Sequence, residues 1–154
     1  IIMGLALVVY EDFKKTDKED FEGFKAYTLD GFEDRIKNLE FGQNYEAKCV
    51  SRLPNVPYSY HNKFRKALAK LAGTDCKTVW ANPDKYANIP FFELIEFADN
   101  EGCMDWEVTA NLAKDFKDLH HKAKEVFSKE MMDHYEDWGL ILEFAEDNRV
   151  LVFC

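Results

Sequence analysis

The run GLALVVY at residues 4–10 decides the fold class of this chain. It is continuously apolar and rich in residues that favour strands, and it therefore predicts a central β-strand. The closing run RVLVFC, residues 149–154, has the same character, and we expect it to pair with the first strand. Alternation over residues 44–52 predicts another strand, and residues 24–29 predict a further short one. The sheet would therefore join the N-terminal, central and C-terminal parts of the chain.

Helical spacing of apolar residues fills much of the remaining sequence. Residues 62–72 place their apolar side chains on one face, and Gly73 is suited to ending that helix. Residues 90–99 begin at Pro90, a residue that the first turn of a helix tolerates. A short helix is also expected over residues 31–41.

The longest periodic stretch covers residues 105–138, where apolar residues recur every three or four positions. A single rod of that length would extend about 50 Å, which is too long for a compact domain of this size. We therefore expect a break near Ser128, whose hydroxyl can cap a new helix. A kink is expected at Gly139, before a final apolar segment at residues 140–146.

Three segments are expected to lie outside regular structure or at its margins. Residues 11–22 are highly charged and predict a loop or a frayed helix. Residues 53–60 contain Pro54 and Pro57 and predict a loop. Residues 74–88 show no regular pattern and are expected to be irregular.

Together these segments predict a single α+β domain spanning residues 1–154, dominated by helices that cover one face of a small sheet. A length of 154 residues, with 47% hydrophobic and 32% charged residues, is ordinary for one globular domain. The chain contains 13 Phe, 7 Tyr and 3 Trp, and we expect most of these rings in the core because they bury large areas.

Charge is divided along the chain. Residues 41–80 carry a net charge of +5, from seven Lys and Arg against two Asp and Glu, whereas residues 1–40 and 81–154 carry −4 and −10. The overall charge of −9 argues against general binding to nucleic-acid backbones or to an anionic membrane surface. It permits an acidic face that binds a basic protein, and it is equally what solubility alone would require.

The cysteines are Cys49, Cys76, Cys103 and Cys154, and none belongs to a CxxC pair. A zinc knuckle and a thioredoxin-like motif are therefore not predicted, and we expect free, buried thiols in a reducing cytoplasm. No stretch approaches the roughly 18 apolar residues of a membrane span, and no signal peptide is recognisable. The expected location is the cytoplasm.

Motifs for a phosphate-binding loop, a dinucleotide site or a nucleophile elbow do not occur in the sequence. The pairs His121/Glu125 and Glu130/His134 have the i,i+4 spacing of facing helical residues, a weak metal signal that solvated helices show routinely. We therefore predict no metal, no cofactor and no catalytic residue.

The basic segment at residues 41–80, which we call the basic centre, predicts a site for a small anionic ligand or nucleotide. Its candidate residues are Tyr58, Ser59, Tyr60, His61 and Arg65, at the start of the helix near residue 62. Backbone N–H groups at a helix start attract anions, tyrosine rings can stack on a base, and arginine can hold a phosphate with two hydrogen bonds. The alternative is that the tyrosines pack on the core while the cations pair with acids of the flanking segments, residues 1–40 and 81–154.

The acidic C-terminal half predicts a non-enzymatic binding protein whose partner has a basic surface. The candidate partner-binding residues are Asp133, Glu136 and Asp137, and complementary charge would steer the association. An enzymatic alternative stays open, a hydrolase that uses His61 or His120 together with an acidic residue from the loop near position 100.

Two segments, PYSYHNKFRKALAKLAG at residues 57–73 and PFFELIEFADNEGCM at residues 90–104, carry a resemblance. Together with the opening Met3-Gly4-Leu5, they resemble small bacterial and phage proteins with no assigned activity. The chain departs from their pattern at Ala6, where Asp is usual, at Asn100, where Cys is usual, and at Arg65, which follows Phe64 directly.

The resemblance implies that Tyr58 and Ser59 meet the acidic loop residues Asp99, Glu101 and Gly102 in a polar cleft. Independently of the resemblance, the hydrolase alternative would pair His61 or His120 with Asp99 or Glu101. The resemblance also implies a phage or bacterial origin, in the cytoplasm of a bacterial cell or an infected host. These proteins have no activity to carry over; the role of inhibitor of a host defence protein is expected from the acidic binding face together with that origin.

Overall fold

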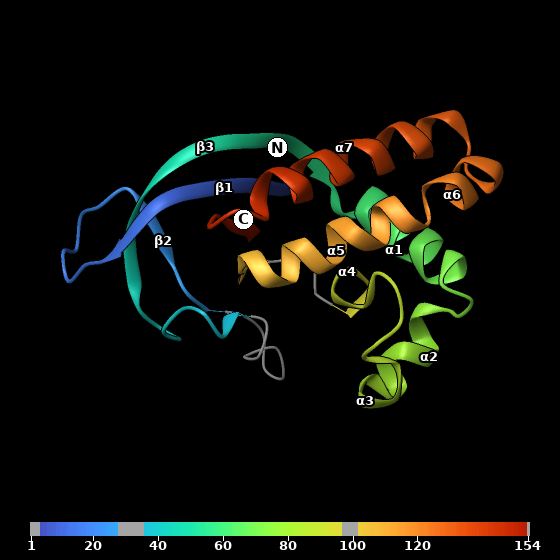
Figure 1. Ribbon diagram of the computed structural model, residues 1–154, viewed down its shortest axis with the longest axis horizontal. Helices are drawn as coiled ribbons and strands as arrows, with labels where there is room; N and C mark the ends of the chain where they lie inside the picture. Colours follow the sequence, from blue (N-terminus) through green and yellow to red (C-terminus); the bar gives the residue numbers. More distant parts are fainter. Residues whose placement is uncertain (1–3, 28–35, 97–101, 154) are drawn as a thin grey trace.

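The computed structural model describes residues 4–27, 36–96 and 102–153. The strands are β1 (Gly4–Lys15), β2 (Gly23–Lys25), β3 (Asn44–Pro57), β4 (Gly102–Met104) and β5 (Val150–Phe153). The helices are α1 (Tyr58–Leu71), α2 (Cys76–Ala81), α3 (Pro83–Tyr86), α4 (Phe92–Glu96), α5 (Trp106–Asp118), α6 (His120–Val126) and α7 (Lys129–Ala145). The predicted α+β fold class is confirmed (Figure 1).

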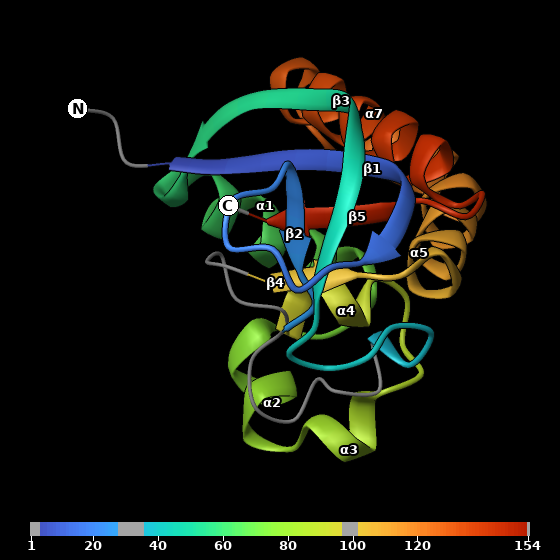
Figure 2. The ribbon, with the colours of Figure 1, turned by 90° about the vertical axis from the view of Figure 1, so that its left-hand side faces the viewer.

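The strands form one sheet in the order β2-β3-β1-β5-β4, and every neighbouring pair is antiparallel. Leu7 in β1 stands opposite Leu53 in β3 on one side and Phe153 in β5 on the other. The expected central position of the first strand and its pairing with the C-terminal run are therefore both confirmed (Figure 2).

One face of the sheet packs on the helices. Alternate residues of β1, namely Leu5, Leu7 and Val9, are buried together with Phe64 of α1 and Trp138 of α7. Strand side chains alternate between faces, so this pattern assigns every second residue of β1 to the helical side. Helices α1, α5 and α7 lie behind the sheet in Figure 2.

The other face of the sheet is also covered, which the sequence did not predict. A second cluster is buried there, and its members include Phe24, Tyr45, Cys103 and Val150. The rings of Phe24 and Tyr45 stack with their centroids 5.4 Å apart. Strands β1 and β3 are long and curved, and in Figure 2 β2 runs alongside β3 and in front of β1. The sheet thus curls over its own second face, and Trp106 at the start of α5 packs against the same cluster.

The charged segment at residues 11–22 is only partly a loop, because β1 continues through Lys15. Asp12 has a φ of 54°, and the pairing register with β3 shifts between Glu11 and Lys14. A bulge of this kind bends a strand and strengthens its twist. The bend lets β1 contribute side chains both to the core under the helices and to the second cluster inside the curled sheet.

The predicted loop at residues 53–60 is wrong. Strand β3 runs through both prolines to Pro57, and α1 begins at the next residue. Strand β2 pairs only with residues 44–46 of β3, so the C-terminal part of β3 has a free edge there among the described residues. Proline is tolerated on such an edge because no ladder hydrogen bond needs its missing N–H.

The predicted irregular segment at residues 74–88 is also wrong, because it contains α2 and α3. Each helix has a start signal. Asp75 caps α2 by accepting a hydrogen bond from the Thr78 N–H at 2.8 Å, and Pro83 stands in the first turn of α3. Both helices are too short for a hydrophobic period to reveal them.

The helix expected over residues 31–41 falls partly outside the described residues, and residues 36–41 form turns rather than α-helix. The break expected near Ser128 is confirmed, since the Ser128 hydroxyl accepts a hydrogen bond from the Met131 N–H at 3.2 Å. Helix α7 continues through Gly139 as one helix to Ala145. Gly73, with a φ of 87°, ends α1 as predicted.

We expect Asp105→Ala to lower the free energy of unfolding by about 2–3 kcal/mol. The buried Asp105 carboxylate accepts hydrogen bonds from the N–H groups of Glu107 and Val108, which caps α5, and from the Asn38 backbone and side chain. Urea unfolding measures the change. A loss no larger than that of Asp75→Ala, an exposed cap, would contradict a tertiary role for Asp105.

Candidate functional site

Helix α1 separates the five residues predicted to bind an anion. His61 and Arg65, one turn apart, are buried, whereas Ser59 is exposed. The Tyr60 ring stands edge-on to the ring of His134 on α7, with centroids 4.9 Å apart, and Tyr58 packs against the main core. The tyrosines are therefore in contact with protein, as the alternative interpretation expected.

Arg65 holds the C-terminal end of α4. Its guanidinium donates hydrogen bonds to the carbonyls of Leu94 and Ile95 at 3.1 Å, and the Trp80 indole N–H donates to the Ile95 carbonyl at 3.0 Å. A helix leaves its last carbonyls without internal partners and carries partial negative charge there. Arg65 satisfies these groups, so its position is structural. Ligand binding by Arg65 stays a prediction.

His61 is fully buried and stacks on the Trp138 ring, with centroids 5.7 Å apart. Among the described residues, neither ring nitrogen has a hydrogen-bond partner. Burial, reinforced by the positive charge of Arg65 and by His134, lowers the pKa of His61 from 6.5 to about 3. A neutral ring closed off from solvent cannot reach a substrate, so this geometry does not favour His61 as a hydrolytic base.

His120, the other histidine considered for hydrolysis, lies on the surface with its Nε2 atom 3.1 Å from the Glu136 carboxylate. Asp99 and Glu101 lie outside the described residues. Gly102 is buried in β4, where it pairs with Phe153. Strands β5 and β1 stand between β4 and β3 in the sheet. Gly102 is therefore not a neighbour of the α1 start that follows β3.

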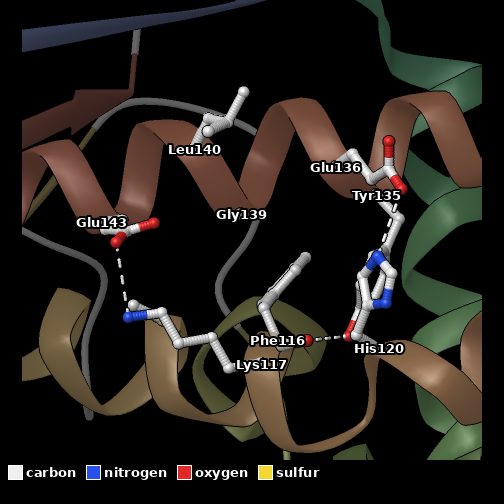
Figure 3. Close-up of a pocket in the computed structure, with 9 residues that line it drawn as sticks. Phe116, Lys117, His120, Tyr135, Glu136, Gly139, Leu140 and Glu143 are labelled. Atoms are coloured by element: carbon white, nitrogen blue, oxygen red, sulfur yellow. Dashed lines mark hydrogen bonds and ion pairs between the residues drawn. The ribbon is translucent and has the colours of Figure 1, made fainter.

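A groove of about 490 Å³ lies between α5 and α7 (Figure 3). We call it the α5–α7 groove. Its lining residues are Ala113, Phe116, Lys117, His120, Tyr135, Glu136, Gly139, Leu140 and Glu143. The Phe116 ring forms the floor beneath Gly139, where the absence of a side chain on α7 leaves room. Two polar contacts cross the groove: the Lys117–Glu143 ion pair at 3.4 Å and a hydrogen-bond contact between His120 Nε2 and the Glu136 carboxylate at 3.1 Å.

The outward face of α7 combines acidic and apolar side chains. We call it the α7 outer stripe, and its members are Asp133, Glu136, Asp137, Leu140, Glu143 and Phe144. Leu140 is 67% exposed and Phe144 is 38% exposed, so this face carries two of the five large apolar side chains that are exposed among the described residues. A second hollow of about 360 Å³, which Leu53 and Ile141 help to line, borders Leu140. Leu140 thus stands between two depressions.

The charge on α7 is strongly negative, with one Lys against five Asp and Glu. Asp133 and Asp137 form no ion pair within the part of the chain that the structure describes. The three residues predicted from the sequence, Asp133, Glu136 and Asp137, therefore lie on one exposed surface. Sequence reasoning missed Leu140 and Phe144, which a helical projection continued from Trp138 through Gly139 would have placed on that face.

The thiols of the described cysteines are free. Cys76 and Cys103 are buried as expected, and burial raises the pKa of both, to about 12 for Cys103. Cys49 is only partly buried, and Cys154 lies outside the described residues. No group of three or more His, Cys, Asp or Glu side chains suited to hold a metal ion occurs among the described residues.

None of the helices within the described ranges combines the length and apolarity needed to cross a bilayer. Comparisons of the chain with family models, with curated proteins and with solved structures found no match.

We expect the free energy of unfolding to fall by about 1.5 kcal/mol between pH 6.5 and pH 5 because of His61. The unfolded chain takes up a proton on this ring near pH 6.5, whereas the folded protein does so only near pH 3. Acidification through 6.5 therefore favours the unfolded state. Urea unfolding at several pH values measures the slope.

His61→Phe is the matched variant, because it keeps a ring against Trp138 and removes the titrating group. It should unfold with a weaker pH dependence over the same window. Some slope remains, because burial also lowers the pKa of His134. An unchanged slope in His61→Phe would show that the ring is accessible to protons in the folded protein.

Proposed function

We propose that this chain is a non-enzymatic binding protein that recognises a basic surface of another protein. The binding surface is the α7 outer stripe with the adjoining α5–α7 groove. The observation that carries the proposal is the position of Leu140. Its side chain is 67% exposed, borders two hollows and is surrounded by carboxylates. Large exposed apolar groups with polar rims are typical of interaction sites.

The apolar part of this surface would supply most of the affinity. Binding energy concentrates in a few buried contacts, where a side chain of one partner fills a hollow of the other. The floor of the α5–α7 groove is Phe116, and Gly139 leaves space above it for an aliphatic or aromatic side chain. Leu140 would in turn enter the partner's surface, because it projects from α7 away from that floor (Figure 3).

The acidic part would select and steer a basic partner. Asp133 and Asp137 are exposed, and a lysine or arginine of the partner could pair with either. The pairs Lys117–Glu143 and His120–Glu136 bridge the groove but are exposed themselves. Exposed pairs contribute only about 0–1 kcal/mol each. Their rearrangement on binding would therefore cost little.

Such a surface suits an inhibitor that acts by covering its target. This is the role expected of a binding protein of phage or bacterial origin, and it requires no catalytic group on this chain. A bacterial cytoplasm would be its place of action. The proposal predicts that the partner is basic and presents an exposed apolar side chain.

We expect the triple change Asp133→Asn, Glu136→Gln and Asp137→Asn to weaken partner capture and to flatten its salt dependence. The protein, immobilised on beads, is exposed to bacterial lysate at 50 and 300 mM salt, since exposed charges are screened over about a Debye length. The matched control, Asp17→Asn, Glu19→Gln and Asp20→Asn, removes three exposed carboxylates elsewhere. Equal capture by the triple variant and the control would sink the proposal.

We expect Gly139→Ala to raise the free energy of unfolding by about 0.5–1 kcal/mol, because glycine is a poor helix former. The added methyl would lie 3.7 Å from the Phe116 ring, which is ordinary contact. The same methyl would fill the groove floor and weaken capture. If Gly139→Ala is more stable than the unmodified chain and yet captures less partner, the loss of binding is not caused by unfolding. If Gly139→Ala and Leu140→Asp both bind like the unmodified chain, the groove is not the site.

A further inference from the structure

A further hollow, lined mainly by basic rather than acidic residues, lies between α1 and α2. We call it the Trp80 pocket. It has a volume of about 590 Å³, within the range of small-molecule sites. In Figures 1 and 2 α2 lies at the bottom of the molecule and α7 at the top. The Trp80 pocket is therefore separate from the surface proposed for the protein partner.

Three lysines surround this pocket from both helices. Lys66 and Lys70 are one turn apart on α1, and Lys77 stands opposite on α2. All three are exposed, so their ammonium groups can turn toward a ligand. Their convergence gives the pocket a positive potential in a chain whose overall charge is −9.

The acidic member of the lining, Asp75, does not cancel this charge. Its carboxylate accepts hydrogen bonds from the Thr78 N–H at 2.8 Å and the Thr78 hydroxyl at 3.0 Å. These bonds direct it to the start of α2. Asp75 is the one carboxylate among the described residues that line the pocket, against the three lysines and Arg65. The pocket therefore favours an anion.

Trp80 gives the pocket a fixed aromatic wall. Its indole N–H donates to the Ile95 carbonyl at 3.0 Å, which sets the plane of the ring, yet the residue is 44% exposed. The Arg65 guanidinium lies over the ring, 5.2 Å from its centroid. A ring held in place and open to solvent is suited to stack on a planar ligand, since aromatic stacking contributes about 1–3 kcal/mol per base.

We infer that the Trp80 pocket binds a nucleoside phosphate, with the phosphates on Lys66, Lys70 and Lys77 and the base on Trp80. Lysine binds phosphate as a point charge, and three such charges match a di- or triphosphate better than a single phosphate. The pocket shares Arg65 with the anion site predicted at residues 58–65, but its lysines and its aromatic ring are different residues. This inference is independent of the proposed protein-binding surface.

The test is calorimetric titration at low salt with inorganic phosphate, pyrophosphate, AMP, ADP and ATP. We expect ADP to bind more tightly than pyrophosphate, and pyrophosphate more tightly than phosphate. The triple change Lys66→Gln, Lys70→Gln and Lys77→Gln should weaken ADP binding at least about tenfold. Because these lysines are exposed, the variant should keep the melting temperature of the unmodified protein.

The matched control changes Lys63, Lys124 and Lys129 to Gln, which removes three exposed positive charges elsewhere. It should bind ADP like the unmodified protein. Trp80→Phe keeps a ring and should retain the preference for ADP over pyrophosphate, whereas Trp80→Leu should lose it. These two variants test the ring separately from the charges.

Three results would overturn the inference. The first is that no nucleotide binds more tightly than about 1 mM. The second is that the lysine variant and its control lose affinity equally, because the effect would then be general electrostatics. The third is equal affinity for ADP and pyrophosphate, which would remove the role of Trp80.

Discussion

Strand β1 must be paired on both edges and covered on both faces, and the rest of the molecule meets this requirement. Strands β3 and β5 pair with its edges, and its side chains alternate between the helical core and the second core inside the curled sheet. The bulge at Asp12 bends the strand, so that its end follows the curl of the sheet around the second core. Helices α1 and α7 pack on the first face through Phe64 and Trp138, and this packing places both candidate surfaces.

Helix α1 illustrates how a compact sequence motif is divided by helical geometry. Successive residues point about 100° apart, so neighbours in sequence face different surroundings. His61 and Arg65 point inward, where Arg65 replaces the missing hydrogen-bond partners of a five-residue helix. Lys66 and Lys70 border a hollow with α2. Some cations of the basic centre thus hold α4 in place, whereas others line the hollow between α1 and α2.

The apolar runs and the long helical periods were sufficient to predict the central strand, its C-terminal partner and the break at Ser128. These patterns failed where a helix is too short to repeat its hydrophobic period, as in the six-residue α2, or where an edge strand tolerates Pro57. The acids of α7 were predictable because charge patterns mark exposed faces. Leu140 was not, since an apolar residue in a helix is assigned to the core unless its angular position is traced. The Trp80 pocket depends on tertiary contact between α1 and α2, which no local pattern encodes.

The opposite charges of the α7 outer stripe and the Trp80 pocket have a consequence for the free molecule. Acids along one helix and lysines around a separate pocket make the charge distribution of the chain uneven, in addition to its net charge of −9. Such molecules turn in each other's fields as they approach, so that the acidic end of one faces the basic end of the next. Head-to-tail contacts of this kind give rings where the rotation closes and open filaments where it does not. The repulsion between two net charges of −9 opposes them at low salt, and the screening length of about 8 Å at physiological ionic strength weakens both the repulsion and the attraction.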